Sequence, residues 1–174
     1  FEYLPSSTWI ADYYPKGIGF YKWLANTGWD ESKAIKEAAG TRGSKVHQAL
    51  DYLEDNGKFP IDMVLEDLPM TTEELDAIMS FSAWWHEERP QLLAKEMVVF
   101  GEGYAGTLDR IYRIGGRVWI VDFKTSQDIW ESMRLQISSY SNADIDYKAL
   151  GITDEEWAAR GLAVLQVGYR RNKA

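Results

Sequence analysis

Two consecutive glycines, Gly115 and Gly116, constrain the fold of this 174-residue chain more than any other feature of its sequence. They separate two runs, 105–114 and 117–124, whose valine, isoleucine, tyrosine, tryptophan and phenylalanine content is typical of strands. A two-residue loop between such runs predicts a tight antiparallel hairpin, because glycine tolerates the positive φ angles that the turn requires.

The register of this hairpin brings two carboxylates together. If Ile114 faces Arg117, pairing outward from the turn places Asp109 opposite Asp122, with Cβ atoms about 4.5–5.5 Å apart. Lys124 lies two residues beyond Asp122 and therefore projects from the same face. Facing carboxylates repel unless a cation lies between them or one of them is protonated. The adjacent ammonium group could then orient a water molecule or stabilise negative charge on a phosphate.

A structural explanation of the same residues is a surface hairpin in which Asp109 pairs with Arg110 or Arg113, and Asp122 pairs with Lys124. Apolar residues on both faces of the hairpin argue against a surface position, since they predict a sheet that is covered on both sides. One face carries Leu108, Tyr112, Trp119, Val121 and Phe123, and the other carries Ile111, Val118 and Ile120.

The remainder of the chain alternates between helical and extended patterns. Helices are expected at 6–14, 17–27, 30–57, 71–88, 131–147 and 153–160, and strands at 92–100, 105–114, 117–124 and 162–169. Gly40 and Gly43 are expected to interrupt the helix at 30–57. This order predicts a single α/β domain over residues 1–174, with a helical region at 1–60 and a central mixed sheet, flanked by helices, within 92–170.

Composition limits the chemistry of any site. The chain has no cysteine, which excludes disulfides, zinc–thiolate sites and iron–sulfur clusters and fits a cytoplasmic protein. His47 and His86 are the two histidines, so a metal site would consist mostly of oxygen ligands, which favours magnesium, manganese or calcium. No apolar run approaches the roughly 20 residues that span a bilayer, so no membrane partner is expected.

The net charge of −8 excludes a uniformly basic nucleic-acid-binding protein. The acidic excess lies within 61–100, which carries two basic and nine acidic residues, so a local basic groove remains compatible with the sequence. Trp23 is a candidate for stacking on unpaired bases. The candidate phosphate contacts are Arg42, Lys45, Arg170, Arg171 and Lys173.

Two segments of the hairpin, Gly106-Thr-Leu-Asp109 and Val121-Asp-Phe-Lys-Thr125, resemble the PD-(D/E)XK nuclease superfamily in its RecB-like form. Upstream, Gly43-Ser-Lys-Val-His47 resembles the helix whose histidine reaches the metal in that group. Downstream, Gln136-Ile-Ser-Ser-Tyr140 resembles its Q-x-x-x-Y motif, whose two named residues share one helix face. Leu108 replaces the proline of the superfamily name.

The resemblance implies a restriction-endonuclease-like core that holds magnesium or manganese and no iron–sulfur cluster. Its ligands would be Asp109, Asp122, the backbone carbonyl of Phe123 and His47, and Glu96 on the preceding strand is either a further ligand or an edge charge.

The remaining motif residues would act on the substrate side. Lys124 would position the attacking water, and Gln136 and Tyr140 would position that lysine or contact DNA. His86 has no motif partner and is expected to be structural.

We therefore expect a metal-dependent deoxyribonuclease, an exonuclease that prefers DNA with single-stranded ends to blunt duplex. The opening of the chain, Leu4-Pro-Ser-Ser-Thr8 followed by Trp9 and Trp23, resembles cluster-free phage nucleases and the mitochondrial genome maintenance exonuclease. A cytoplasmic protein of phage, viral or prokaryotic context is therefore expected. Two alternatives remain open: a non-catalytic nucleic-acid-binding module of the same fold, and a carboxylate–metal hydrolase of small phosphate esters.

Overall fold

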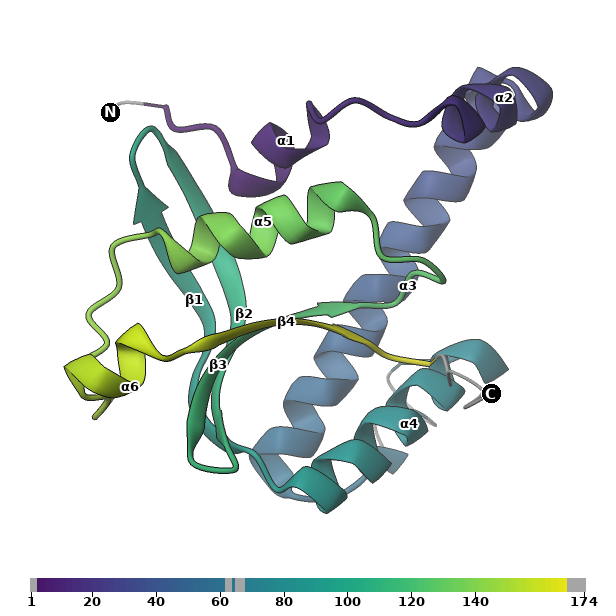
Figure 1. The fold of residues 1–174 in the computed structure, drawn as a ribbon. Helices are drawn as coiled ribbons and strands as arrows, with labels where there is room; N and C mark the ends of the chain where they lie inside the picture. Colours follow the sequence, from purple (N-terminus) through teal and green to yellow (C-terminus); the bar gives the residue numbers. More distant parts are fainter. Residues whose placement is uncertain (1–2, 62–63, 65–67, 169–174) are drawn as a thin grey trace, which may run out of the picture. The chain divides into compact units, whose positions relative to one another are not determined.

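A computed structural model describes residues 3–61, 64 and 68–168. It is an α/β structure with a four-stranded mixed sheet flanked by helices and an N-terminal helical region, as the sequence predicts (Figure 1). The chain divides into two compact units. The first contains Phe1–Tyr14, Trp85–Lys124 and Asp128–Leu165, and the second contains Pro15–Trp84, Thr125–Gln127 and Gln166–Ala174.

The sheet belongs almost entirely to the first unit. Its order is β1 (Gln91–Gly101), β2 (Tyr104–Ile114), β3 (Arg117–Lys124) and β4 (Gly161–Gln166), and β2 pairs antiparallel with both β1 and β3. The predicted hairpin register is confirmed, because Ile114 pairs with Arg117.

The turn of this hairpin has the backbone that the sequence requires. Gly115 and Gly116 have φ angles of 57° and 80°, a region that side chains disfavour.

Helix α5 (Glu131–Ser141) contributes to the hydrophobic core of the first unit. It ends at Ser141 rather than at the predicted 147, because the chain then turns and the N–H of Asp144 donates to the carbonyl of Phe100. Helix α6 (Asp154–Ala158) follows it with Thr153 as its N-cap. The buried members of this core are Val99, Leu108, Ile111, Val118, Ile120, Ile137, Tyr140, Ile145 and Ile152.

The N-terminal segment also belongs to the first unit. Helix α1 (Ser7–Asp12) lies against α5, and its N-cap Ser6 accepts a hydrogen bond from the N–H of Trp9 (Figure 1). Just before the helix, the carbonyl of Pro5 accepts from the N–H of Ala105 at the start of β2. The segment is thereby joined to both the sheet and α5.

The second unit contains α2 (Ile18–Thr27), α3 (Trp29–Asn56) and most of α4 (Thr72–Glu88). The expected interruption at Gly40 and Gly43 is wrong, since α3 runs through both positions. A glycine costs a helix interior only about 1 kcal/mol, and burial of one face of α3 outweighs that cost. The buried apolar residues of α3 are Val46, Ala49, Leu50 and Leu53.

The start of α4 forms the predicted capping box. Thr71 Oγ1 accepts from the N–H of Glu74 at 3.3 Å, and Glu74 Oε2 accepts from the N–H of Thr71 at 2.7 Å. Among the helices in the described part of the chain, none is long and apolar enough to cross a bilayer.

Candidate metal centre

Asp109 and Asp122 continue the hairpin ladder away from the turn. The ladder pairs Arg110 with Val121, and the two aspartates are the next residue on each strand. Asp109 is partly buried, and its Oδ2 accepts a hydrogen bond of 2.6 Å from the N–H of Phe123. Asp122 is fully buried. The hairpin therefore carries both carboxylates at the same level of the sheet, as its register predicts.

Lys124 lies beside the buried aspartate. Its Nζ atom is 2.7 Å from Asp122 Oδ2, and the lysine side chain keeps 22% of its surface exposed. This contact matches the ion pair of the structural explanation, and it equally holds an ammonium group next to the carboxylates, where a catalytic cation would be needed. The ion pair alone does not distinguish the two explanations.

Glu96 on β1 approaches Asp109 from the other side. Its neighbours Lys95 and Met97 pair with Arg110 and Leu108, so Glu96 lies level with Asp109 across the ladder. A carboxylate oxygen of Glu96 lies within 4.8 Å of one of Asp109. Two carboxylates at this distance repel in the absence of a cation.

The backbone of Glu96 is unusual for a strand. Its φ angle is 46°, in the left-handed region that non-glycine residues seldom adopt. Such backbone strain costs about 1–3 kcal/mol and gathers at functional sites. Here the strained residue is the one whose carboxylate lies near Asp109.

The sequence does not indicate the role of Arg110. This arginine is fully buried, and its Nη1 atom lies 3.0 Å from Glu96 Oε1 and donates to the backbone carbonyl of Asp109 at 2.7 Å. Its guanidinium group also lies 5.2 Å from the centre of the Phe123 ring. The available signal was a charged residue directly next to Asp109 on a strand rich in apolar residues.

Gln136 and Tyr140 on α5 are buried, and their side chains are hydrogen-bonded to each other. Gln136 Nε2 donates to the hydroxyl of Tyr140 at 2.7 Å, as expected of residues four apart on one helix face. Burial raises the pKa of Tyr140 to about 12, and the negative charges of Asp122 and Asp109 act in the same direction. The tyrosine therefore lies within electrostatic range of both aspartates.

The pKa of Tyr140 predicts a loss of stability in alkaline solution. Because the folded pKa of about 12 exceeds the usual 10, the folded state retains a proton that the unfolded state releases above pH 10. We expect wild-type stability to fall by about 2 kcal/mol more than that of Tyr140→Phe between pH 10 and pH 12. Urea unfolding at pH 8, 10 and 12 measures this, and parallel curves for the two proteins would contradict it.

Gly106 in the motif before Asp109 allows Tyr140 to approach β2. A Cβ atom at this position would lie 2.8 Å from Tyr140 Cε1 and 3.1 Å from Ser7 Cβ. We expect Gly106→Ala to displace the tyrosine ring and to lower stability by about 1–3 kcal/mol. Gly40→Ala is the matched control, since nothing lies within 4 Å of its added methyl group. If both substitutions stabilise the protein equally in urea, the close approach at Gly106 is wrong.

Both histidines lie on helices, His47 on α3 and His86 on α4. His47 is partly buried on α3 of the second unit, so its role as a metal ligand stays a prediction from the motif. His86 lies in the last turn of α4, with its ring 5.2 Å from that of Trp85, which is compatible with the structural role expected for it.

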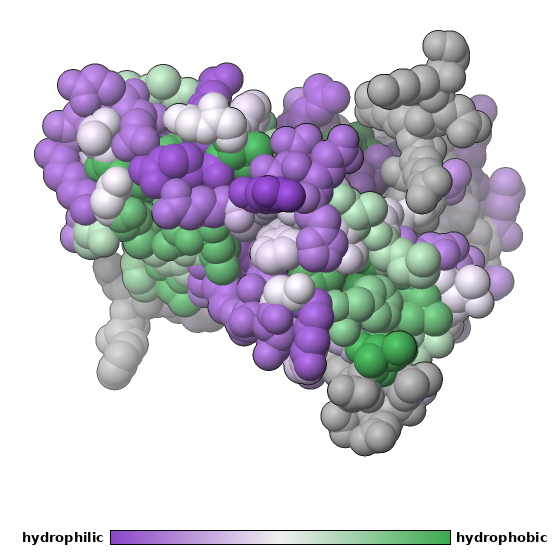
Figure 2. All heavy atoms as spheres, turned by 90° about the horizontal axis from the view of Figure 1, so that it is seen from below, coloured by the Kyte–Doolittle hydropathy of each residue, from purple (hydrophilic) through white to green (hydrophobic). Residues whose placement is uncertain are grey.

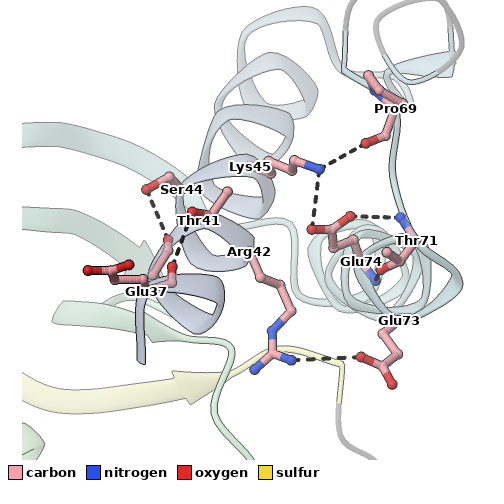
Figure 3. A network of polar contacts seen from close by, with 10 residues as sticks. Glu37, Thr41, Arg42, Ser44, Lys45, Pro69, Thr71, Glu73 and Glu74 are labelled. Carbon is pink, nitrogen blue, oxygen red and sulfur yellow. Dashed lines mark hydrogen bonds and ion pairs between the residues drawn. The ribbon is translucent and has the colours of Figure 1, made fainter. Parts of the chain in front are cut away.

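Two of the candidate phosphate contacts bind acidic residues of α4 instead (Figure 3). Arg42 Nη1 lies 3.7 Å from Glu73 Oε2, and Lys45 Nζ lies 3.7 Å from Glu74 Oε1. Lys45 also donates to the carbonyl of Pro69 at 3.0 Å. These cations could meet a phosphate only in competition with carboxylates of the same unit. The other three candidates, Arg170, Arg171 and Lys173, lie outside the described residues.

Aromatic side chains are exposed along the start of the second unit. Trp23 is 38% exposed and its ring lies 5.9 Å from that of Phe20, while Trp29 at the start of α3 is 73% exposed. Figure 2 shows that apolar areas also reach the surface between polar ones on the face seen from below. Stacking of Trp23 on unpaired bases stays a prediction.

The grouped residues can hold a divalent cation. Glu96 and Asp109 offer oxygen ligands within 4.8 Å of each other, and Asp122 adds a buried carboxylate from the next strand. An all-oxygen set of this kind suits magnesium or manganese. No protein-family model matches the chain, and the search of curated proteins returned no match.

Proposed function

We propose that this chain is a metal-dependent deoxyribonuclease. The observation that carries the proposal is the register of three adjacent strands, which places the carboxylates of Glu96, Asp109 and Asp122 at one level of the sheet, with the ammonium group of Lys124 at 2.7 Å from the carboxylate of Asp122. Such a cluster costs folding energy through repulsion and desolvation. A bound metal ion would offset that cost, so a hydrolytic metal site accounts for the carboxylates. The resemblance of the surrounding motifs to RecB-like nucleases supports DNA as the substrate.

Carboxylate oxygens of Asp109, Asp122 and Glu96, with the backbone carbonyl of Phe123, would hold magnesium or manganese. When bound, such an ion polarises the scissile phosphate and lowers the pKa of a coordinated water. Asp109 is already oriented by the hydrogen bond from Phe123, and Glu96 by Arg110. These contacts fix the carboxylates before a substrate arrives.

The remaining residues would act on the substrate. Lys124 is held by Asp122 and can orient the attacking water or stabilise charge that develops on the phosphate. Tyr140, whose pKa of about 12 keeps it protonated at neutral pH, can donate its hydroxyl hydrogen to a phosphate oxygen without becoming an anion. Both groups stabilise negative charge near the carboxylates.

Incubation with end-labelled single-stranded DNA, blunt duplex and duplex with single-stranded ends, in magnesium, manganese or EDTA, tests the proposal. We expect cleavage that requires the metal and favours single-stranded ends. Binding without cleavage would instead support a non-catalytic module. Hydrolysis of p-nitrophenyl phosphate with no cleavage of DNA would support a phosphoesterase for small substrates.

A further inference from the structure

The N-terminal segment before and within α1 makes polar contacts with the helix that carries Gln136 and Tyr140. The hydroxyl groups of Ser7 and Ser139 are hydrogen-bonded to each other, and Thr8 Oγ1 accepts a hydrogen bond from Gln136 Nε2 at 3.0 Å. These residues are about 130 positions apart in sequence, and all belong to the first unit. The segment therefore contributes directly to the polar environment of α5.

Thr8 determines how the amide of Gln136 is used. A glutamine amide has two N–H hydrogens, and those of Gln136 are donated to Thr8 Oγ1 at 3.0 Å and to the Tyr140 hydroxyl at 2.7 Å. With both donors engaged, rotation of the amide would break two hydrogen bonds at once. The side chains of Gln136 and Tyr140 are only 8% and 2% exposed, so the hydrogen bond between them is shielded from water.

The position of Thr8 also affects the direction of the tyrosine hydroxyl. Because the Tyr140 oxygen accepts from Gln136, its own hydrogen remains available for donation to another acceptor. The Tyr140 ring lies against β2 just before Asp109, since a Cβ atom at Gly106 would lie 2.8 Å from Tyr140 Cε1. If the amide turned its oxygen toward Tyr140, the tyrosine hydroxyl would instead donate its hydrogen to that oxygen.

We propose that Thr8 is a positioning residue of the carboxylate site, which holds the Gln136 amide so that the Tyr140 hydroxyl remains a donor to the reacting phosphate. The inference rests on the proposed nuclease function for its catalytic consequence. Its structural part, the orientation of the amide by Thr8, holds independently of the reaction.

Three substitutions separate positioning from simple stability. Thr8→Val removes the hydroxyl while keeping the shape, Thr8→Ser restores it, and Ser7→Ala removes the neighbouring bond to Ser139 without touching the Gln136 amide. Thr8 is exposed, so valine is tolerated there, and Thr8→Ala serves as a second variant. We expect Thr8→Val to lower kcat on single-stranded DNA about 3–10-fold, the effect of one lost neutral hydrogen bond, with KM unchanged.

Side-chain amide signals of Gln136 in ¹⁵N NMR spectra of the metal-free protein provide a readout other than activity. We expect faster amide hydrogen exchange and a shifted signal in Thr8→Val, with wild-type behaviour in Thr8→Ser and Ser7→Ala. Equal losses of kcat in Thr8→Val and Ser7→Ala, or an unchanged Gln136 signal in Thr8→Val, would overturn the proposal. Wild-type protein that cleaves no DNA would overturn the proposed function, and the amide signals would then decide whether Thr8 orients Gln136.

Discussion

Replacement of Asp109 by asparagine is expected to reduce DNA cleavage by at least about 10³-fold, while the metal-free protein stays as stable as the wild type or becomes more stable. The asparagine oxygen can still accept the hydrogen bond that Phe123 donates to Asp109 Oδ2 at 2.6 Å. What the substitution removes is one negative charge, and Glu96 offers a carboxylate oxygen within 4.8 Å of it. Activity and apo stability should therefore change in opposite directions.

Asp146→Asn is the matched control for this prediction. Asp146 is exposed and also accepts a backbone hydrogen bond, from Ala149 at 3.2 Å, but it lies apart from the carboxylate cluster. Calorimetric titration with manganese should show weak binding to Asp109→Asn and normal binding to Asp146→Asn, and urea unfolding without metal measures stability. Normal cleavage by Asp109→Asn in magnesium would show that the site has been assigned to the wrong residues.

Local patterns in the sequence were sufficient to predict the hairpin and the pairing of Gln136 with Tyr140. The hairpin register depends on a two-residue turn, and glycines at 115 and 116 leave few other loop lengths compatible with the flanking strands. The contact between Gln136 and Tyr140 depends only on helix periodicity, because residues four apart lie on one face. Both are short-range relations that the chain encodes within about ten residues.

The features that the sequence did not predict depend on long-range packing. Thr8 meets Gln136 across 128 positions, and no local pattern near residue 8 indicates that partner. Arg110 was considered only as a surface partner of Asp109, whereas burial in the sheet directs it to Glu96. The left-handed φ of Glu96 on β1 likewise has no signature in the sequence.

The continuity of α3 shows how tertiary packing can outweigh a local signal. Two glycines favour a break, since each costs a helix about 1 kcal/mol, but burial of side chains beyond them stabilises the uninterrupted helix. Leu50 and Leu53 are both fully buried, and a buried leucine contributes about 1.5–3 kcal/mol. The sum favours one helix of 28 residues over two shorter ones.

Removal of the Lys124 ammonium group should separate turnover from metal binding. We expect Lys124→Ala to lower kcat by about 10²-fold or more, the range for a lost electrostatic or proton-transfer group. Manganese affinity should remain nearly unchanged, because an ammonium nitrogen has no lone pair to offer a metal. Lys148→Ala is the control, since Lys148 pairs with Asp154 in an exposed contact away from the cluster.

The burial of Asp122 adds a second consequence for Lys124→Ala. Lys124 Nζ lies 2.7 Å from Asp122 Oδ2, and the aspartate is fully buried, so loss of the cation leaves a buried charge less compensated. Metal-free Lys124→Ala should therefore be less stable by about 2–3 kcal/mol, and added manganese should stabilise the variant and the wild type equally because it binds both with nearly the same affinity. Calorimetry in which Lys124→Ala loses metal affinity together with activity would mean that the lysine acts by holding Asp122 in place, since a group that acts on water or phosphate leaves the ligands of the metal intact.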